Sequence, residues 1–275
     1  MSIPNLQDKY VLVTGAASGI GRATALAFAA QGANLFIADI DRIALESLCA
    51  DITAGGAVCI AHVTDVSDSQ AMRQLADAVH AVVPALDVLV NNAGIAYLGS
   101  FAETSLATWD RMLQVNLMGV VHSCQSFLPQ MRHAGGPRHI LNVASLAGIS
   151  PPPNVSAYAA SKFAVMGLCE VLALELAGSG VRVSAVCPGV VDTAITQGKR
   201  GASISDAQVA RLRAYYKKHG GPPEEVAAAI VNAVRRGHDL VLAGPYAQLM
   251  YQIKRLSRAL AHRLNLVAAV NSGYL

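Results

Sequence analysis

Most of the information about the fold lies in the stretch Tyr10-Val-Leu-Val-Thr-Gly15-Ala-Ala-Ser-Gly19-Ile-Gly21. It begins as a β-rich apolar run, passes through a turn with three glycines, and leads into an alanine-rich helical segment that ends at Gly32. A strand, a glycine-rich turn and a helix in this order are typical of the first half of a dinucleotide-binding unit. The glycines let the backbone approach a pyrophosphate, which the start of the helix favours electrostatically. The turn alone is weak evidence, because other turns between a strand and a helix also contain glycines.

Strand-like and helix-like segments alternate along the rest of the chain. Further strands are predicted at residues 33–38, 57–63, 87–90, 139–143, 182–187 and 239–243, and the longest helices at 105–131 and 158–176. Capping-box spacing opens helices at Ser67 and Ser205, and two prolines open another at Pro222. The alternation predicts an α/β protein with a single Rossmann-type domain, in which a doubly wound, mostly parallel seven-stranded sheet carries helices on both faces.

The composition is that of a globular domain. Of the 275 residues, 53% are apolar and 14% are charged, so the chain can bury a large core. The net charge of +3 arises from residues 245–275, which contain Lys254, Arg255, Arg258 and Arg263 and no acidic residue. The remaining residues carry 17 basic and 18 acidic groups. A body so close to neutrality predicts that nucleic acid is not a partner.

The cysteine pattern bears on metal binding and on the compartment. The five cysteines are odd in number, widely spaced and set among apolar residues, which predicts free thiols in a reducing compartment and no metal site. The first residues lack the basic and apolar segments of a signal peptide, and no uncharged apolar run approaches the ~18 residues of a spanning helix. These features favour a cytoplasmic protein.

An acidic residue, Asp39, ends the second predicted strand about 20 residues beyond the glycine turn. A carboxylate there can accept hydrogen bonds from an adenosine ribose and would repel a 2′-phosphate. Neither Ser18 nor Ile40 supplies a cation for such a phosphate, and Arg42 is expected on a helix surface. The sequence therefore favours NAD over NADP. The alternative role of Asp39 is to cap the helix that begins near Asp41.

Polar residues follow two further strands. Asp65 ends the third predicted strand at the sheet edge where ligands bind, and it either meets an adenine or caps a turn. The fourth strand runs into Asn91-Asn-Ala-Gly94. Asn116 lies among apolar residues in a predicted helix, whose local structure an asparagine disfavours. It is either a buried amide satisfied by the backbone or an anchor for a water molecule.

The candidates for catalysis are Tyr158 and Lys162, with Ser145 thirteen residues before the tyrosine. Residues four apart share one face of a helix, so the Lys162 ammonium is expected near the Tyr158 phenol and should lower its pKa. Such a phenol can exchange a proton with a carbonyl or alcohol oxygen, which Ser145 could hold by a hydrogen bond. Taken alone, the pair would more often be a surface tyrosine beside a lysine.

Together, these motifs stand in an order that resembles a known family. Thr14-Gly-x-x-x-Gly19-x-Gly21, Asn91-Asn-Ala-Gly94, Asn116, Ser145, Tyr158-x-x-x-Lys162 and Pro188-Gly189 are similar to the motifs of the short-chain dehydrogenase/reductase family, in its compact single-domain branch. The resemblance covers about residues 8–243, so the catalytic, dinucleotide-binding domain is expected over residues 1–244.

The resemblance implies a catalytic tetrad. Tyr158 would be the acid/base and Ser145 would orient the reacting oxygen, so both would contact the substrate. Lys162 would lower the pKa of Tyr158 and bind the nicotinamide ribose, and Asn116 would hold a relay water. The dinucleotide site implied by the family comprises Gly15, Ser18, Gly19, Ile20, Gly21, Asp39, Asp65, Val66, Asn92, Gly94, Tyr158, Lys162, Pro188, Gly189, Val191 and Thr193. The family's usual oligomers pack the helices of Asn116 and Tyr158 between subunits, so a homodimer or homotetramer is expected.

The expected reaction is hydride transfer between NAD and a secondary alcohol or ketone. Apolar residues surround the expected site: Leu146, Ala147, Ile149, Val155 and Val190, with Leu212, Tyr215 and Tyr216 from a lid over 194–221. They predict a hydrophobic substrate of the steroid, retinoid or fatty type, unless Lys199 and Arg200 fold inward. A non-catalytic NAD-binding protein with a regulatory or scaffold role is the alternative, and an epimerase or dehydratase that uses NAD transiently is a third hypothesis.

Residues 245–275 extend beyond this domain as a predicted amphipathic, basic helix. Its apolar face comprises Tyr246, Leu249, Met250, Ile253, Leu256, Leu260 and Leu264, while Lys254, Arg255, Arg258 and His262 fall mostly on the other face. The helix either packs its apolar stripe on the body or a neighbouring subunit, or lies at a membrane surface as a peripheral contact.

Overall fold

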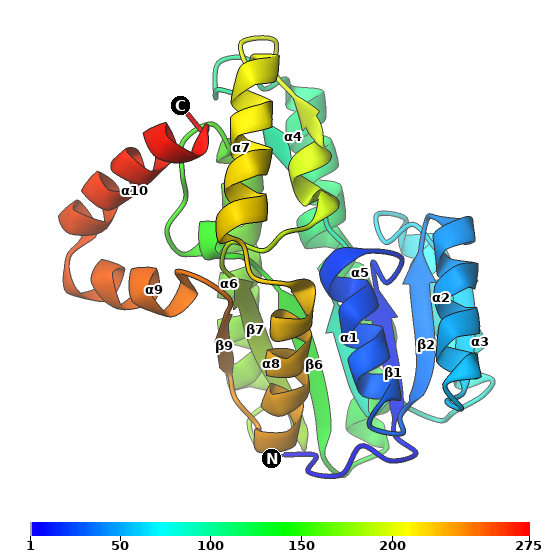
Figure 1. The fold of residues 1–275 in the computed structure, drawn as a ribbon. Helices are drawn as coiled ribbons and strands as arrows, with labels where there is room; N and C mark the ends of the chain where they lie inside the picture. The colour runs from blue at the N-terminus through cyan, green and yellow to red at the C-terminus, as the bar shows by residue number, and fades with distance from the viewer. Residues whose placement is uncertain (1) are drawn as a thin grey trace.

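A computed structural model of the protein describes residues 2–275 (Figure 1). Within these residues, seven strands form one sheet in the order β3-β2-β1-β4-β6-β7-β9. The strands are β1 (Tyr10–Thr14), β2 (Asn34–Asp39), β3 (Cys59–Val63), β4 (Val88–Asn91), β6 (Arg138–Val143), β7 (Val181–Pro188) and β9 (Leu240–Ala243). The predicted doubly wound α/β fold is confirmed, and each pair of neighbouring strands in this sheet is parallel.

Helices cover both faces of the sheet. One face carries α1 (Gly19–Ala29), α2 (Arg42–Ala54) and α8 (Pro223–Arg236), and the other carries α3 (Ser69–His80), α5 (Gly119–His133) and α6 (Ser156–Glu175). Successive residues of one strand point to opposite faces, so Val11 and Val13 belong to the first core and Leu12 to the second. Because both faces are covered, the strands are nearly continuous apolar runs.

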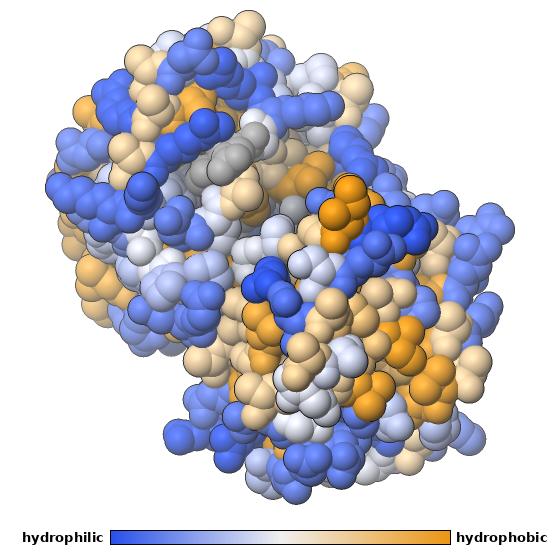
Figure 2. All heavy atoms as spheres, turned by 45° about the vertical axis from the view of Figure 1, so that its right-hand side comes forward, coloured by the Kyte–Doolittle hydropathy of each residue, from blue (hydrophilic) through white to orange (hydrophobic). Residues whose placement is uncertain are grey.

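The strand order reverses between β1 and β4. From β1 the chain adds β2 and β3 in one direction, and from β4 it adds β6, β7 and β9 in the other. The carboxyl ends of β1 and β4 therefore flank a crevice of the kind in which open α/β sheets bind ligands. Figure 2 shows the molecule hollowed between its upper part, which holds α7, and its lower part, which holds the sheet.

The carboxyl edge of the sheet is covered by short elements and by one longer helix. They are β5 (Tyr97–Leu98), η2 (Leu146–Gly148), η3 (Ala194–Gln197), β8 (Lys199–Arg200) and α7 (Asp206–His219). The predicted capping box at Ser205 is confirmed, since its side chain accepts from the Gln208 amide while the Gln208 side chain accepts in return. The pairing of β5 with β8, which attaches the predicted lid to the loop after β4, was not expected from the sequence.

Two local predictions were wrong. The helix expected over 105–131 is α4 (Leu106–Leu113) followed by a π-helical turn, η1 (Gln114–Met118), before α5 begins. The helix expected to start with a capping box at Ser67 is instead capped by Asp68, whose carboxylate accepts from the amides of Gln70 and Ala71. Ser67 turns back and donates to Asp65 at 2.6 Å, so it is not available as a cap.

The extension over 245–275 is two helices rather than one. They are α9 (Ala247–Leu256) and α10 (Arg258–Ser272), which Figure 1 shows projecting from the body as an arm. Ser257 breaks the helix because its backbone is extended (φ −153°) and its side chain caps α10 by accepting from the Leu260 amide at 3.2 Å.

One described helix, α6, is long and apolar enough to cross a membrane by length and composition alone, although no spanning helix was predicted. It lies against the sheet and buries Val165 and Cys169 in the core together with strand residues. Core helices of this kind pass the same test, so α6 is weak evidence for a membrane span.

Candidate active site

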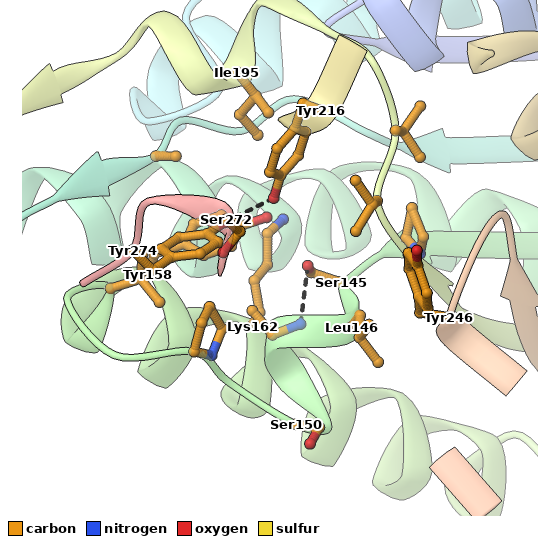
Figure 3. A pocket seen from close by; sticks show the side chains of 18 of the residues that line it. Ser145, Leu146, Ser150, Tyr158, Lys162, Ile195, Tyr216, Tyr246, Ser272 and Tyr274 are labelled. Carbon is orange, nitrogen blue, oxygen red and sulfur yellow. Dashed lines mark hydrogen bonds between the residues drawn. The ribbon is translucent and has the colours of Figure 1, made fainter. Parts of the chain in front are cut away.

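A cavity of about 680 Å³ lies over the carboxyl ends of β4, β6 and β7. The helices α6 and α7 and the arm formed by α9 and α10 contribute to its walls. Figure 3 shows side chains from these elements converging on it. Of the residues predicted to form the site, the cavity is lined by Ile20, Asn92, Gly94, Ser145, Tyr158, Lys162, Pro188, Gly189, Val191 and Thr193.

Three side chains with catalytic potential meet in this cavity. Ser145 follows β6 and is fixed by a hydrogen bond that its oxygen accepts from the Ala147 amide at 3.1 Å. Tyr158 and Lys162 lie one turn apart on α6, with the lysine nitrogen 5.9 Å from the centre of the tyrosine ring. Lys162 is buried and donates to the carbonyl of Val143 at 2.8 Å, which ties α6 to the end of β6.

The expected lowering of the Tyr158 pKa is not found. Burial raises the pKa of Tyr158 to about 12, although a hydrogen bond with Ser145 acts in the opposite direction. Burial also lowers the pKa of Lys162 to about 8. Desolvation disfavours both charged forms, and it outweighs the attraction between a phenolate and an ammonium in this dry position. At neutral pH, Tyr158 therefore holds its proton.

Asn116 is fully buried in the π-helical turn and is not in the cavity wall. Its side chain accepts from the Ile95 amide at 2.8 Å and donates to the Ile95 carbonyl at 3.0 Å and to the Ser161 hydroxyl at 3.0 Å. These contacts match the alternative in which the amide is satisfied by the backbone. Asn116 also lies close to Lys162, because a β-carbon at Gly94 would lie 3.2 Å from the Asn116 oxygen and 3.4 Å from the Lys162 nitrogen.

The glycine-rich turn packs too tightly for a side chain at Gly15 or Gly21. Gly15 has φ +64°, and a β-carbon there would lie 2.6 Å from the Ala93 backbone. A β-carbon on Gly21 would lie 2.0 Å from the Gly15 carbonyl oxygen. Within the described residues, Ser18 makes no side-chain cap for α1, so the first amides of this helix remain free for an anion.

Asp39 is placed against the glycine turn rather than against the next helix. Its carboxylate accepts from the Ala17 amide at 2.9 Å and from the Asp41 amide at 3.1 Å. Asp41 itself caps α2 through the Ala44 amide, which removes the capping alternative for Asp39. The arginines nearby are engaged, Arg22 with Asp51 at 2.6 Å and Arg42 with Glu46 at 3.5 Å.

Asp65 and Val66 serve the local structure after β3. Burial acts to raise the pKa of Asp65, but hydrogen bonds from Ser67 and the charge of Arg111 outweigh it and hold the pKa below its ordinary value. The Val66 side chain is buried in the core, and its carbonyl lies 3.1 Å from the His122 ring. Neither side chain lies in the cavity, so any contact of Val66 with a dinucleotide would involve its backbone.

Asn92 braces the glycine turn from the neighbouring strand. Its side chain donates to the carbonyls of Thr14 and Gly15 at 3.1 and 3.0 Å, while its amide donates to the Thr14 hydroxyl at 3.1 Å. On the far side, Thr193 lies close to the turn, because a side chain at Gly19 would be 3.2 Å from its methyl group. The ends of β1, β4 and β7 therefore meet around one groove.

Apolar side chains form most of the substrate side of the cavity. The predicted residues Leu146, Ala147, Val155, Val190, Leu212, Tyr215 and Tyr216 line it, whereas Ile149 and Arg200 do not. Lys199 is at the wall, as the sequence analysis allowed. Sequence reasoning missed Tyr97, Tyr246 and Tyr274, so six of the eight tyrosines line this cavity. The missed residues lie outside the family motifs, and no local pattern in the sequence marks them as members of the site.

Comparisons with known proteins agree with this geometry. Residues 9–203 match the family model described as short chain dehydrogenase. The chain is 39% identical over 255 residues to "Probable oxidoreductase EphD" of Mycobacterium tuberculosis, covering 90% of this chain and 43% of that protein. It is also 39% identical over 251 residues to "D-threitol dehydrogenase" of Mycolicibacterium smegmatis, covering 88% of this chain and 94% of that protein. The chain therefore spans less than half the length of the EphD relatives it matches.

Solved structures match over almost the whole chain. A short-chain dehydrogenase/reductase from Burkholderia phymatum in complex with NAD is 31% identical, with a TM-score of 0.87 and coverage of 94% of this chain and 96% of that chain. A metagenomic short-chain oxidoreductase in complex with NADP is 32% identical, with a TM-score of 0.70 and coverage of 84% and 92%. The chain belongs to the short-chain dehydrogenase/reductase family of oxidoreductases, whose members bind NAD or NADP.

Proposed function

We propose that this protein is an NAD-dependent oxidoreductase that interconverts a hydrophobic secondary alcohol and a ketone, with Tyr158 as the general acid/base. One observation carries the proposal: Ser145, Tyr158 and Lys162 share an apolar cavity that opens beside the braced glycine turn. A proton donor and a dinucleotide groove are thus next to each other. That is the arrangement needed for reversible hydride transfer.

The residues present fit a dinucleotide. Gly15 and Gly21 leave room for close backbone approach, and the uncapped start of α1 offers amides to a diphosphate. Asp39 would accept hydrogen bonds from the adenosine ribose, and its negative charge favours NAD over NADP. Asn92, Gly94, Val191 and Thr193 would hold the nicotinamide half, because they line the cavity next to Lys162. When bound, the dinucleotide supplies or accepts the hydride.

The protein's own side chains would move the proton. Ser145 would hold the reacting oxygen together with Tyr158, since its hydroxyl oxygen accepts from a backbone amide and its hydroxyl, now hydrogen-bonded with the Tyr158 phenol, can donate its proton to a bound oxygen. Tyr158 carries its proton at neutral pH, so it would give that proton to a ketone oxygen and, in the reverse direction, take one from an alcohol. Lys162 would supply positive charge beside the phenol from a position fixed by Val143. Asn116 would act by positioning these groups through Ile95 and Ser161.

The cavity supports a substrate larger and more apolar than a short polyol. Its walls include Leu146, Val190, Met250 and Leu264, and these apolar side chains suit a molecule of steroid or long-chain type. The volume of about 680 Å³ has to admit the nicotinamide as well as the substrate. The relative named D-threitol dehydrogenase acts, by its name, on a small polyol. Large apolar alcohols and small polyols are therefore the two substrate classes that the assay has to compare.

The alternative is a non-catalytic NAD-binding protein with a regulatory or scaffold role. The complete set of Asn116, Ser145, Tyr158 and Lys162 argues against it, because binding alone would not require a buried phenol beside a hydroxyl. We also propose a homodimer or homotetramer formed through α5 and α6. Its support is the exposed apolar face of α6, where Val171 and Leu174 are 52% and 78% accessible.

We further propose a cytoplasmic protein whose arm contacts an anionic membrane surface. Leu256, Leu266 and Val267 are 88%, 55% and 62% exposed on α9 and α10, and residues 245–275 contain no acidic side chain. The exposed cations Arg258 and Arg263 lie among them. Two copies of such a face would repel each other, whereas anionic lipid would attract both its charges and its leucines.

The test is an absorbance assay for the reduced cofactor with NAD or NADP and three substrate groups: steroid alcohols, fatty secondary alcohols and small polyols. The proposal predicts turnover with NAD on the apolar groups. Turnover on polyols alone would support the proposed hydride transfer and contradict the proposed hydrophobic substrate. Binding of NAD without turnover on any substrate favours the non-catalytic alternative.

A further inference from the structure

Two tyrosines from neighbouring elements meet in the cavity wall. Tyr216 lies on α7, and Tyr274 follows the end of α10. Their hydroxyl oxygens lie 2.7 Å apart, as the dashed line in Figure 3 shows. Tyr274 lies beside Tyr158 in this view. Burial raises the pKa of the Tyr274 phenol well above its ordinary value, and the neighbouring phenols of Tyr216 and Tyr158 raise it further.

The short segment that carries Tyr274 is held in place by specific contacts. Asn154 donates its side-chain amide to the Tyr274 carbonyl at 2.6 Å. Gly273 has φ +94°, and a β-carbon there would lie 2.8 Å from the Gln208 carbonyl and 2.9 Å from the Leu212 amide of α7. The segment therefore docks against α7 so closely that only glycine fits, and Tyr274 has a defined position in the cavity wall.

One of the two hydroxyl protons of Tyr216 and Tyr274 has no acceptor among the described residues. Each phenol has one proton to donate, and the bond between Tyr216 and Tyr274 uses one of the two. Within the described residues, no second partner is found for either hydroxyl. A buried donor without a partner costs free energy, so a ligand that accepts from it gains affinity.

We propose that the Tyr216–Tyr274 pair is a second polar anchor that donates a hydrogen bond to an oxygen of the substrate other than the reacting one. This inference rests on the proposed function, and it narrows the substrate class. The substrate is a largely apolar secondary alcohol or ketone with a second oxygen function, such as a hydroxyketone or a diol. Ser145 and Tyr158 bind the reacting oxygen, and the tyrosine pair selects the second.

The test compares methyl octyl ketone with a set of its hydroxylated analogues, in which the hydroxyl moves along the chain. Each analogue carries its hydroxyl on a tertiary carbon. Calorimetric titration in saturating oxidised NAD then measures affinity without turnover, because oxidised NAD can neither reduce a ketone nor oxidise a tertiary alcohol. The proteins are the wild type, Tyr216→Phe, Tyr274→Phe and the control Tyr251→Phe. The control variant loses a phenol hydroxyl from the same arm, at a residue that does not line this cavity.

At least one hydroxyketone should bind the wild type and Tyr251→Phe about tenfold more tightly than the parent ketone, the value of one good hydrogen bond. This gain should disappear in at least one of Tyr216→Phe and Tyr274→Phe, namely the variant that removes the phenol donating to the ligand, while the parent ketone binds all four proteins alike. Three results overturn the inference: no gain in the wild type, a gain that survives in both variants, or equal weakening of parent and hydroxylated ketones, which would make the pair a structural latch. A preserved gain pattern with no NADH-dependent reduction of any ketone would instead contradict the proposed function.

Discussion

Asn116 and Ile95 are joined by two hydrogen bonds that replace main-chain partners. The Asn116 oxygen accepts from the Ile95 amide at 2.8 Å, and its nitrogen donates to the Ile95 carbonyl at 3.0 Å. The same nitrogen reaches Ser161 on α6 at 3.0 Å. One side chain therefore links the loop after β4, the π-helical turn and the helix that carries Tyr158 and Lys162.

Replacing Asn116 with alanine should lower both stability and turnover. The part-buried amide and carbonyl of Ile95 would lose their partners, at a cost of about 1–3 kcal/mol in the free energy of unfolding. Denaturant unfolding and steady-state assays measure the two effects. The control is Gln114→Ala, an exposed position in the same turn, which should change stability by less than about 0.5 kcal/mol. Equal effects of the two substitutions would contradict this role.

The hydrogen bonds of Asn116 also show which part of the site could not be predicted from the sequence. An asparagine among apolar residues of a helix is unfavourable, and the sequence predicted either a buried amide satisfied by the backbone or an anchor for a water molecule. The π-helical turn was not predictable, because Ile95 and Ser161 lie 21 and 45 residues away from the side chain that they stabilise. The local spacing of residues predicts helices, but it does not predict a hydrogen-bond partner that lies on another element.

The strands were predictable for the opposite reason. Each is a short apolar run bounded by turn residues, and burial on both faces leaves that signal in the sequence itself. The break between α9 and α10 was missed although Ser257 is a good helix cap, because the apolar spacing continues through it. The place of Tyr274 was not predictable, since it depends on the docking of Gly273 against α7.

The cofactor prediction can be tested at Asp39. Replacing Asp39 with alanine removes a carboxylate that would bind the ribose of NAD and repel the phosphate of NADP. The ratio of kcat/KM for NAD to that for NADP should fall about 10- to 100-fold, as expected for hydrogen bonds to a charged group. The control Asp41→Ala removes the neighbouring carboxylate, which caps α2, and should leave the ratio unchanged. An unchanged ratio in Asp39→Ala would mean that Asp39 does not select the cofactor.

The raised pKa of Tyr158 predicts different pH profiles for the two directions. Burial holds this pKa at about 12, so the phenol is protonated near neutrality. Ketone reduction uses the protonated form and should change little between about pH 6 and 8, whereas alcohol oxidation needs the deprotonated form and should rise with pH. Initial rates in both directions test this at saturating cofactor. An oxidation rate that falls as pH rises would show that another group is the base.

The membrane proposal predicts sedimentation with anionic vesicles. Vesicles of phosphatidylserine and phosphatidylcholine should pellet the wild type, and they should release most of it in high salt, which screens the attraction of Arg258 and Arg263. Leu266→Glu combined with Val267→Glu should prevent pelleting, because it adds negative charge to the exposed face of α10. The control is Ile43→Glu on α2, an exposed apolar position away from both the arm and the proposed subunit interface. Equal binding by all three proteins, or by none, would rule out the arm as the contact.

The most direct test of the central claim is Tyr158→Phe, which removes one hydroxyl and keeps the ring. Reduced-cofactor absorbance measures turnover on an alcohol that the wild type oxidises, and cofactor fluorescence measures NADH binding. The account predicts that kcat falls about 10²- to 10⁴-fold, the usual contribution of a general acid/base, while the Kd for NADH stays within about twofold. If Tyr158→Phe retains wild-type turnover, Tyr158 is not the proton donor and the proposed mechanism is wrong.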